Sequence, residues 1–479
     1  MKKKMKVSRY LHFLPVDKEM YIGWNRFFPS IFILNKSALE LLDRIKKDKP
    51  IEANEEMERF FEELKKYRFL YEGDGNDPYK ENFLNIVQQN IHELDCRAKD
   101  FYQLEEDYSE LRLVNEECNL NCSYCVNHYG FPAPPAHTRV KKKLADKLRI
   151  INKCVDQFFS RKIKKGLQDA EISFNGGEIL VDWPLVKKIL QQISKKYPGI
   201  NIKYQINTNL ALLTEEMARF FKRHHFKVHI SIDGYREAHN KTRKYHNGKG
   251  SFDDIIKKVE RYRKINKKDS LVTFQGTIEY PDEFRPEEVY KMDKYGFVSA
   301  RLAPNLLNVS EEDAKKKAIL MGKFLELNSR YPFQVTELIF TKAKDKINQQ
   351  EYQFSFNCRG LSGFHKLGIE INLSTLAASH LCGFIQQAAL PMEKLRGDIY
   401  NPELWQVSYQ FIKERMETVL KNCMECPLIG ICVGGCILSG IDSRNRLNKA
   451  ACVYQKEMWN IYVKKAYQDR KKKKEKVNC

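Results

Sequence analysis

The sequence contains no apolar run long enough to cross a membrane, which takes about 20 consecutive residues. Its basic start, Met1-Lys-Lys-Lys-Met-Lys6, is followed by neither a hydrophobic region nor a small-residue cleavage site, so no signal peptide is predicted. These absences predict a cytoplasmic protein with no membrane partner. In that reducing compartment the 13 cysteines are not expected to form disulfides, and their clustering favours metal binding.

Acidic residues are in the minority, because 62 Asp and Glu face 83 Lys and Arg and leave a net charge of +21. A nucleic acid, an acidic peptide partner or a simple lysine bias would each account for this excess. The lysines form no single stripe, and Arg470–Lys474 is the one basic block. We therefore regard nucleic acid as an unlikely partner. Residues 457–479 are predicted to be a basic tail, in which the block Arg470–Lys474 is expected to be solvated and disordered.

The 479 residues predict more than one domain. Residues 1–80 read as a small winged-helix-like module in which two helices, the first capped by Asn35, separate short strands. The predicted strands are Tyr10–Leu14, Met20–Ile22, Ser30–Leu34 and Phe69–Tyr71. The polar, helix-leaning residues 81–107 are predicted to be a bridging linker.

Residues 108–340 alternate predicted strands with helices, which indicates a parallel sheet in an α/β fold. Small or polar residues follow the carboxyl end of each strand, where the active sites of parallel barrels lie. We therefore predict a partial (β/α)6 TIM-like barrel. Its strands are 111–114, 171–174, 203–206, 228–232, 272–276 and 298–302.

The first of these strands leads into Cys118-Asn-Leu-Asn-Cys122-Ser-Tyr-Cys125. Three thiolates on one tight loop can hold three irons of a [4Fe-4S] cube and leave the fourth iron open. A zinc site is the alternative, with His128 available as a fourth ligand.

A second cysteine group lies in the C-terminal third of the chain. Its centre is Cys423-Met-Glu-Cys426-Pro-Leu-Ile-Gly-Ile-Cys432-Val-Gly-Gly-Cys436, with Cys358 and Cys382 before it and Cys452 after it. The glycines allow the backbone to fold tightly around inorganic sulfur. A pair of structural zinc ribbons is the alternative. Cys96, Cys154 and Cys479 are expected to be thiols without a role.

The first loop resembles the CxxxCxφC signature of radical SAM enzymes. The second group resembles the SPASM extension of peptide-modifying members, here over residues 341–456. The resemblance implies a [4Fe-4S] cluster that binds and reductively cleaves S-adenosyl-L-methionine (SAM), held by Cys118, Cys122 and Cys125. It also implies two auxiliary iron–sulfur clusters, one held by Cys423, Cys426, Cys432 and Cys452 and the other by Cys358, Cys382 and Cys436. No cysteine lies between Cys154 and Cys358, so we expect an open iron or a non-cysteine ligand in the latter cluster.

The same resemblance implies contacts to SAM. Gly176-Gly177-Glu178 resembles the GGE motif that receives its amino acid part, although Ile179 stands where proline is usual. Glu178 would accept from the amine, and Tyr124 would lie against the adenine. Further implied contacts are to the ribose, from Asn207, Asn209 and Ser231, and to the carboxylate, from Arg243.

Residues 1–80 resemble a domain to which a leader peptide adds as a strand. The resemblance thus implies a maturase of a ribosomally made precursor peptide, with an external one-electron donor such as flavodoxin or ferredoxin. A cysteine thioether is the favoured product, and a carbon–carbon crosslink is the near alternative. Two rivals are formylglycine formation of the sulfatase-maturating type and a non-enzymatic iron–sulfur or zinc protein that binds nucleic acid.

Overall fold

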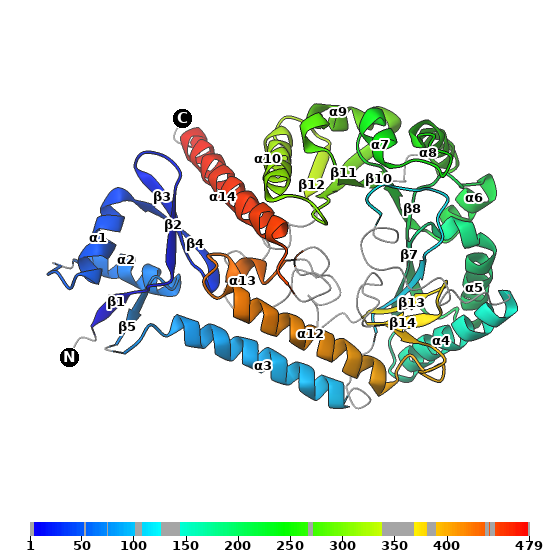
Figure 1. Ribbon diagram of the computed structural model, residues 1–479, viewed down its shortest axis with the longest axis horizontal. Coiled ribbons are helices and arrows are strands. Elements are labelled where there is room, and N and C mark those ends of the chain that lie inside the picture. The colour runs from blue at the N-terminus through cyan, green and yellow to red at the C-terminus, as the bar shows by residue number, and fades with distance from the viewer. Residues whose placement is uncertain are drawn as a thin grey trace. The chain divides into compact units, whose positions relative to one another are not determined.

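The computed structural model describes residues 4–51, 54–73, 75–100, 108–125, 144–266, 272–337, 368–380, 389–435, 440 and 446–477 (Figure 1). The chain forms two compact units. The first combines Met1–Leu94, Ile339–Asn357 and Arg415–Cys479, and the second combines Asp95–Leu338 and Cys358–Glu414. Segments from both ends of the sequence therefore share the first unit.

The second unit is built on a ten-stranded sheet with the order β12-β11-β10-β9-β8-β7-β6-β13-β14-β15. Each pair of neighbours from β12 to β13 is parallel, and β14 and β15 add antiparallel strands. The six predicted strands are β6 (Glu110–Asn115), β7 (Asp169–Gly176), β8 (Asn201–Thr208), β9 (Lys227–Ser231), β10 (Val272–Ile278) and β11 (Phe297–Pro304). The prediction of a mainly parallel α/β sheet is confirmed. Four further strands, which the sequence patterns do not predict, are β12 (Gln334–Glu337), β13 (Gly368–Asn372), β14 (Ala377–Ser379) and β15 (Leu390–Pro391).

Amphipathic helices connect these strands. In α5 (Trp183–Lys196) the buried positions recur at helical spacing, as in Val186, Ile189, Leu190 and Ile193. The other helices of this unit are α4 (Leu144–Lys164), α6 (Glu215–Arg223), α7 (Arg236–Thr242), α8 (Phe252–Asn266), α9 (Pro286–Tyr290) and α10 (Glu311–Leu327). Short 3-10 turns occupy η3 (Ile179–Asp182), η4 (Pro281–Glu283) and η5 (Lys291–Tyr295). Because the connections return each strand in the same direction, the carboxyl ends of β6 to β11 meet at one edge of the sheet.

The first unit contains the antiparallel sheet β2-β3-β4 and the pair β1-β5. Its elements are β1 (Met5–Val7), β2 (Leu11–Pro15), β3 (Met20–Asn25), β4 (Phe28–Asn35), α1 (Lys36–Lys46), α2 (Glu55–Lys66) and β5 (Leu70–Glu72). Asn35 caps α1 as predicted, since its Oδ1 accepts from the Ala38 amide at 2.8 Å. A core of Leu34, Leu42, Ile45, Phe61, Leu64, Phe69 and Leu70 joins both helices to the strands.

Four further helices are α3 (Tyr79–Asp100), α12 (Pro402–Cys423), α13 (Ile429–Cys432) and α14 (Lys449–Val477). The expectation of a disordered tail is wrong, because Arg470–Lys474 continue α14. The first half of this helix buries Tyr454, Met458, Trp459 and Val463. That packing secures the helix, and lysine and arginine are good helix formers that extend it. Among the described residues, no helix combines the length and apolarity that crossing a bilayer requires.

Candidate active site

The three cysteines of the first motif lie on a loop that begins where β6 ends. Backbone hydrogen bonds tie this loop to the segment after α7, from the Asn121 amide to the Lys244 carbonyl at 2.7 Å and from the Ser123 amide to the Thr242 carbonyl at 3.1 Å. A further bond within the loop joins the Cys125 amide to the Cys122 carbonyl at 3.1 Å. The loop is therefore held in a defined path by the backbone that follows β9.

The glycine pair at the end of β7 packs directly against the start of this loop. The Gly177 amide donates to the Asn115 carbonyl, and the Glu178 amide donates to the Glu117 carbonyl at 2.7 Å. Gly176 has a φ of +104°, and a Cβ on either glycine would collide with these backbone oxygens. Two residues without side chains are thus required where the β7 turn meets the cysteine loop.

The Glu178 carboxylate is fully buried. Its Oε1 accepts from the Thr208 hydroxyl at 2.7 Å and the Leu180 amide at 3.0 Å, and its Oε2 accepts from the Asn209 amide at 2.6 Å. Burial raises the pKa of Glu178 to about 7, against these hydrogen bonds. In the structure this carboxylate joins the turns after β7 and β8, and its contact with the SAM amine stays a prediction.

The sulfurs of Cys118 and Cys122 face hydrogen-bond donors. Cys118 Sγ accepts from the Leu120 amide at 3.4 Å and lies 3.9 Å from Asn209 Nδ2, while Cys122 Sγ lies 3.9 Å from Arg243 Nη1. N–H groups directed at sulfur stabilise thiolate charge and tune iron–sulfur clusters. The donor arrangement therefore fits thiolates that hold a cluster.

Burial also decides what these thiols can do without a metal. It raises the pKa of Cys118 to about 11 and that of Cys122 to about 12, so both remain protonated near neutral pH. A bound metal ion deprotonates a coordinating thiol outright. Metal ligation thus suits these buried cysteines better than a role as free nucleophiles. In the part of the chain that the structure describes, no three Cys, His, Asp or Glu side chains converge as a ready metal site, so the ligand assignment depends on spacing and surrounding donors.

Asp233, just after β9, is the centre of the polar network beside the loop. It is 1% exposed and accepts from the Tyr124 hydroxyl at 2.6 Å, the Thr242 hydroxyl at 2.8 Å and the Thr277 amide at 2.8 Å. Its carboxylate also pairs with Arg243, whose Nε lies 3.0 Å from Oδ1. Although burial opposes its charge, Asp233 and the neighbouring Tyr124 and Cys122 hold the pKa of Arg243 above its ordinary value.

This network brings together two of the predicted SAM contacts. The Arg243 guanidinium lies 5.5 Å from the centre of the Tyr124 ring, and both side chains bind Asp233. Asp233 is not among the predicted site residues, although Asp233-Gly234 directly follows a predicted strand of the barrel. A buried aspartate at a strand end is the signal that was missed.

The remaining predicted contacts lie on the same edge of the sheet. Asn207 Nδ2 donates to Asn175 Oδ1, and Asn209 Nδ2 donates to Asn119 Oδ1 at 2.8 Å. Ser231 is the last residue of β9 and pairs with Gln275 of β10. Their contacts with the ribose stay predictions.

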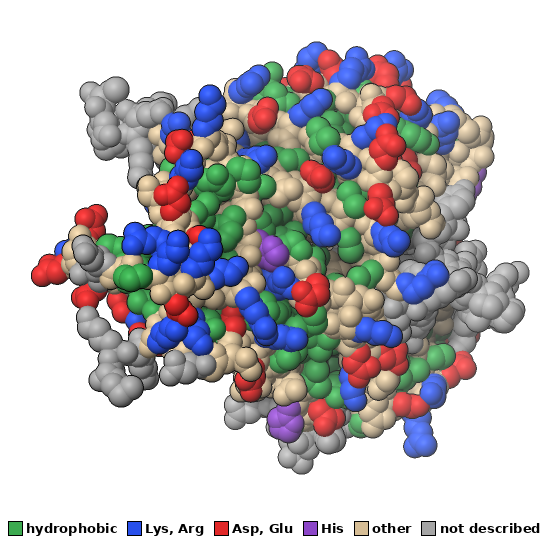
Figure 2. Space-filling view, turned by 60° about the vertical axis from the view of Figure 1, so that its left-hand side comes forward, with side chains coloured by type: hydrophobic (Ala, Val, Ile, Leu, Met, Phe, Trp, Pro, Cys, Tyr) green, Lys and Arg blue, Asp and Glu red, His purple; other side chains and the backbone are tan. Residues whose placement is uncertain are grey.

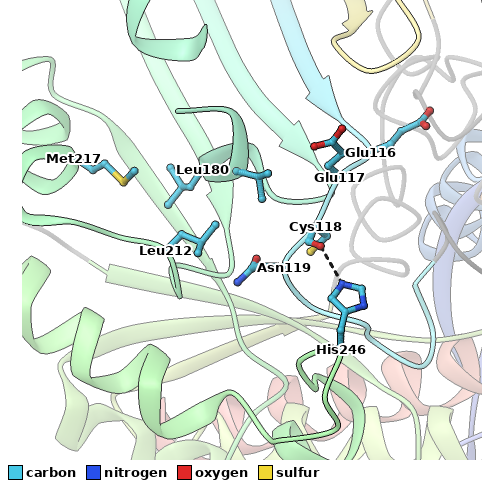
Figure 3. Close-up of a pocket in the computed structure, with 9 residues that line it drawn as sticks. Glu116, Glu117, Cys118, Asn119, Leu180, Leu212, Met217 and His246 are labelled. Carbon is cyan, nitrogen blue, oxygen red and sulfur yellow. Dashed lines mark hydrogen bonds between the residues drawn. The ribbon is translucent and has the colours of Figure 1, made fainter. Parts of the chain in front are cut away.

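A pocket of about 660 Å³ opens beside Cys118 (Figure 3). Leu180, Leu212 and Met217 line one side of it, and Glu116 and Glu117 project from the start of the cysteine loop. The ring of His246 points at the loop, and its Nε2 lies 3.2 Å from the Cys118 carbonyl oxygen. His246 was also missed, because no local pattern links it to a loop more than 100 residues earlier.

The second cysteine group is described in part. Cys358, Cys382 and Cys436, like His128, lie outside the described residues. Burial, together with the nearby Cys426 and Cys452 thiols, raises the pKa of Cys423 to about 12. The Cys426 amide donates to the Cys423 carbonyl at 2.8 Å, which closes a turn between these two cysteines. Two of the four predicted ligands of one auxiliary cluster, Cys423 and Cys426, are thus held in one turn, and Cys452 is near enough to act on Cys423 electrostatically.

Residues 114–318 match the model of the Radical SAM superfamily, and the chain therefore contains a radical SAM domain. A cysteine-type anaerobic sulfatase-maturating enzyme of Clostridium novyi is 33% identical over 159 residues, which make up 32% of this chain and 40% of that enzyme. The radical SAM cyclopropyl synthase TigE of Paramaledivibacter caminithermalis is 22% identical over 354 residues, or 68% of this chain and 66% of that protein.

The solved structure of native anSMEcpe with bound AdoMet and Kp18Cys peptide shares the fold, with a TM-score of 0.54 at 18% identity. The likeness covers 76% of this chain and 99% of that one. In sequence, this chain spans less than half the length of the sulfatase-maturating relatives it matches, 40% of the Clostridium novyi enzyme and 42% of a serine-type enzyme of Bacteroides thetaiotaomicron.

The variant Glu178→Gln tests whether burial raises the pKa of this carboxylate. Because its folded pKa of about 7 lies above the ordinary 4.5, the folded state holds the proton more tightly, and the free energy of unfolding should fall by about 3 kcal/mol as the pH rises from about 4.5 to about 7. Glu178→Gln should lose this decline and, since its amide NH2 faces hydrogen-bond donors, cost about 1–3 kcal/mol at pH 5. Urea unfolding of the metal-free protein between pH 5 and pH 8 measures both effects. The exposed Glu216→Gln should keep the decline, and an unchanged slope in Glu178→Gln would contradict the assignment.

Breaking the Asp233–Arg243 pair should be costly, because its side chains are only 2% and 13% exposed. Asp233→Asn leaves a buried guanidinium unpaired, which costs about 3–5 kcal/mol. The double variant with Arg243→Gln should cost clearly less than the sum of the single changes. The exposed pair Asp253–Arg236 is the control, and Asp253→Asn should cost about 0–1 kcal/mol. Urea unfolding measures all four variants, and equal costs at the two aspartates would refute the buried pair's importance.

Proposed function

We propose that this chain is a radical SAM peptide maturase that acts on a ribosomally synthesised precursor peptide. The observation that carries the proposal is the three-cysteine loop at the carboxyl end of β6, with donors facing two of its sulfurs inside a radical SAM domain. Cys118, Cys122 and Cys125 would hold the cluster. When bound, the cluster and SAM supply a radical able to take hydrogen from an unreactive carbon.

The protein's own side chains position and shield that chemistry. Asp233 keeps Arg243 charged and oriented, so that the guanidinium can stabilise the Cys122 thiolate and bind a ligand carboxylate. Tyr124 is fixed by the same aspartate. Gly176 and Gly177 let the β7 turn close against the loop, which limits the access of water to the sulfurs.

The second cysteine group would hold two auxiliary clusters with the ligand sets given above. The cluster of Cys358, Cys382 and Cys436 would keep an open iron that binds a cysteine thiolate of the substrate. The favoured product is then a thioether between that sulfur and a carbon of the peptide. A carbon–carbon crosslink is the alternative if the auxiliary clusters only accept the resulting electron.

A groove in the first unit supports a peptide partner. It has a volume of about 1140 Å³, an apolar floor that includes Met5, Ile45, Ile51 and Phe61, and a rim of charged side chains. Met5, the first residue of β1, lines this groove, and β1 pairs with β5 in an antiparallel sheet, the kind of backbone to which an extended peptide can add. We infer that a leader peptide binds here as an added strand.

Formylglycine formation is the second candidate, because relatives that are 33% and 29% identical over part of the chain are named sulfatase-maturating enzymes. A nucleic-acid partner has less support. On the face shown in Figure 2, acidic side chains lie among the basic ones, which is unlike the continuous basic stripe of a nucleic-acid site.

The mass of a candidate precursor peptide after anaerobic co-expression tests the function. Loss of two hydrogens, together with a cysteine that no longer alkylates, is the expected result for a thioether. The same mass loss with every cysteine still alkylating would indicate a carbon–carbon crosslink, and a new aldehyde that reacts with a hydrazide would indicate formylglycine. The control is the triple variant Cys118→Ala, Cys122→Ala and Cys125→Ala, which should leave the peptide unchanged. Intact SAM with the unaltered enzyme would reject the radical SAM assignment.

The groove makes its own prediction. Ile51→Asp places a charge on its apolar floor and should weaken binding of a fluorescently labelled leader at least tenfold, while SAM cleavage without peptide stays the same. Ile163→Asp, at an exposed isoleucine of α4, is the matched control and should leave leader affinity unchanged. Fluorescence anisotropy measures the affinity, and equal dissociation constants for both variants would move the leader site elsewhere.

A further inference from the structure

The cysteines Cys423, Cys426 and Cys432 share the first compact unit with the sheet β2-β3-β4. Residues 24–27, which are the last two residues of β3 and the two-residue turn before β4, are called the hairpin tip here. It contacts the segment from Cys423 to Cys432 although the two stretches are about 400 residues apart in sequence. The cysteine segment is therefore supported by the opposite end of the chain.

Two side chains of the hairpin tip bind backbone carbonyls of this segment. Arg26 Nη1 donates to the carbonyl of Met424, between Cys423 and Cys426, at 3.1 Å and to the Glu425 carboxylate at 2.5 Å. Trp24 Nε1 donates to the carbonyl of Pro427, directly after Cys426, at 2.8 Å. The two donors thus hold the turn on either side of Cys426.

A backbone contact secures the next part of the segment. The Gly430 amide in α13 donates to the Arg26 carbonyl at 2.9 Å. A Cβ on Gly430 would collide with the Phe27 carbonyl oxygen, so the close approach requires glycine at this position. The hairpin tip therefore touches the segment before Cys432 as well as around Cys426.

The hairpin tip is itself firmly anchored. Trp24 is 5% exposed and packs edge-on against Trp459 of α14, with ring centres 5.4 Å apart, and α14 also carries Cys452. Phe27 is 1% exposed and stacks on Phe83 at 5.0 Å. Two ring pairs thus anchor the hairpin tip, one to α14, which brings the fourth cysteine, and the other to α3.

The cysteine segment has little regular structure of its own. Its helix α13 has four residues, too few to be stable alone. Val433, Gly434 and Gly435 follow with positive φ angles of 48°, 77° and 74°. A non-glycine residue in this region is strained, and such a path persists only where its surroundings impose it.

We infer that Arg26 and Trp24 are positioning residues for the auxiliary cluster held by Cys423, Cys426, Cys432 and Cys452. This inference rests on the proposed presence of that cluster. The hairpin tip fixes the carbonyls of Met424 and Pro427, and with them the direction of the Cys426 thiol toward those of Cys423 and Cys452. The Arg26 cation beside the turn also favours the more negative, reduced state of the cluster.

The test uses the full chain with Cys118→Ala, Cys122→Ala and Cys125→Ala, in which the first loop holds no iron. Into this parent are placed Arg26→Ala, Arg26→Lys, Trp24→Phe and the control Arg44→Ala. Arg44, in α1 of the same module, donates from Nη2 to the Pro50 carbonyl at 2.6 Å. Iron and sulfide per chain, the electron paramagnetic resonance spectrum after reduction, and the reduction potential are measured anaerobically, and thermal unfolding checks the fold.

Arg26→Ala should lower bound iron by at least a quarter, and the cluster that remains should have an altered spectrum and a more negative potential. Arg26→Lys, which keeps the charge and one donor, should restore most of the iron. Trp24→Phe, which removes one N–H and keeps a ring, should change the spectrum with the fold intact, and Arg44→Ala should match the parent.

The outcomes separate the two proposals. A parent that binds no iron would overturn the auxiliary clusters and the positioning role together. If the parent binds iron, and the Arg26→Ala and Trp24→Phe variants match it in iron content, spectrum and potential, the positioning role alone is overturned. If Arg26→Ala fails to fold, Trp24→Phe decides the question by its spectrum.

Discussion

The candidate site depends on keeping the charge of Asp233 paired inside the protein. Its partners come from the cysteine loop, from α7 and the residue after it, and from β10. In a low-dielectric interior each hydrogen bond to this carboxylate is strong. Removing one partner leaves a buried charged group without compensation for its lost hydration, which is costly. The position of the loop relative to the strand ends is therefore set by a polar network, while the apolar core stabilises the sheet itself.

Burial has a second effect on the same site. It favours the neutral form of Glu178 and of the thiols of Cys118 and Cys122, so this region carries less charge before a cofactor arrives than its sequence suggests. When iron displaces the thiol protons, the resulting thiolates would be stabilised by N–H groups that already point at the sulfurs. The donors that would stabilise bound thiolates are thus in place before a cofactor arrives.

The sequence predicted the parts of this architecture that local patterns specify. Buried parallel strands read as short apolar runs, and the cysteine spacings and the Asn35 cap are visible within a few residues. Pairings between distant segments could not be predicted in the same way, as with β13 beside β6 or Trp24 beside Pro427, 403 residues later. Asp233 and His246 were missed because their importance lies in three-dimensional neighbours. The helical tail was misjudged because its charge block was considered without the apolar positions that begin the same helix.

The union of both chain ends in the first unit has a consequence for biosynthesis. Domains usually fold from the N-terminus as the chain leaves the ribosome, yet the hairpin tip meets its partners only after residues 424–459 have been made. The second unit, which ends at Glu414, is complete earlier. We therefore expect the radical SAM domain to fold first on the ribosome, and the cysteine segment around Cys426 to become ready for iron only on the finished chain.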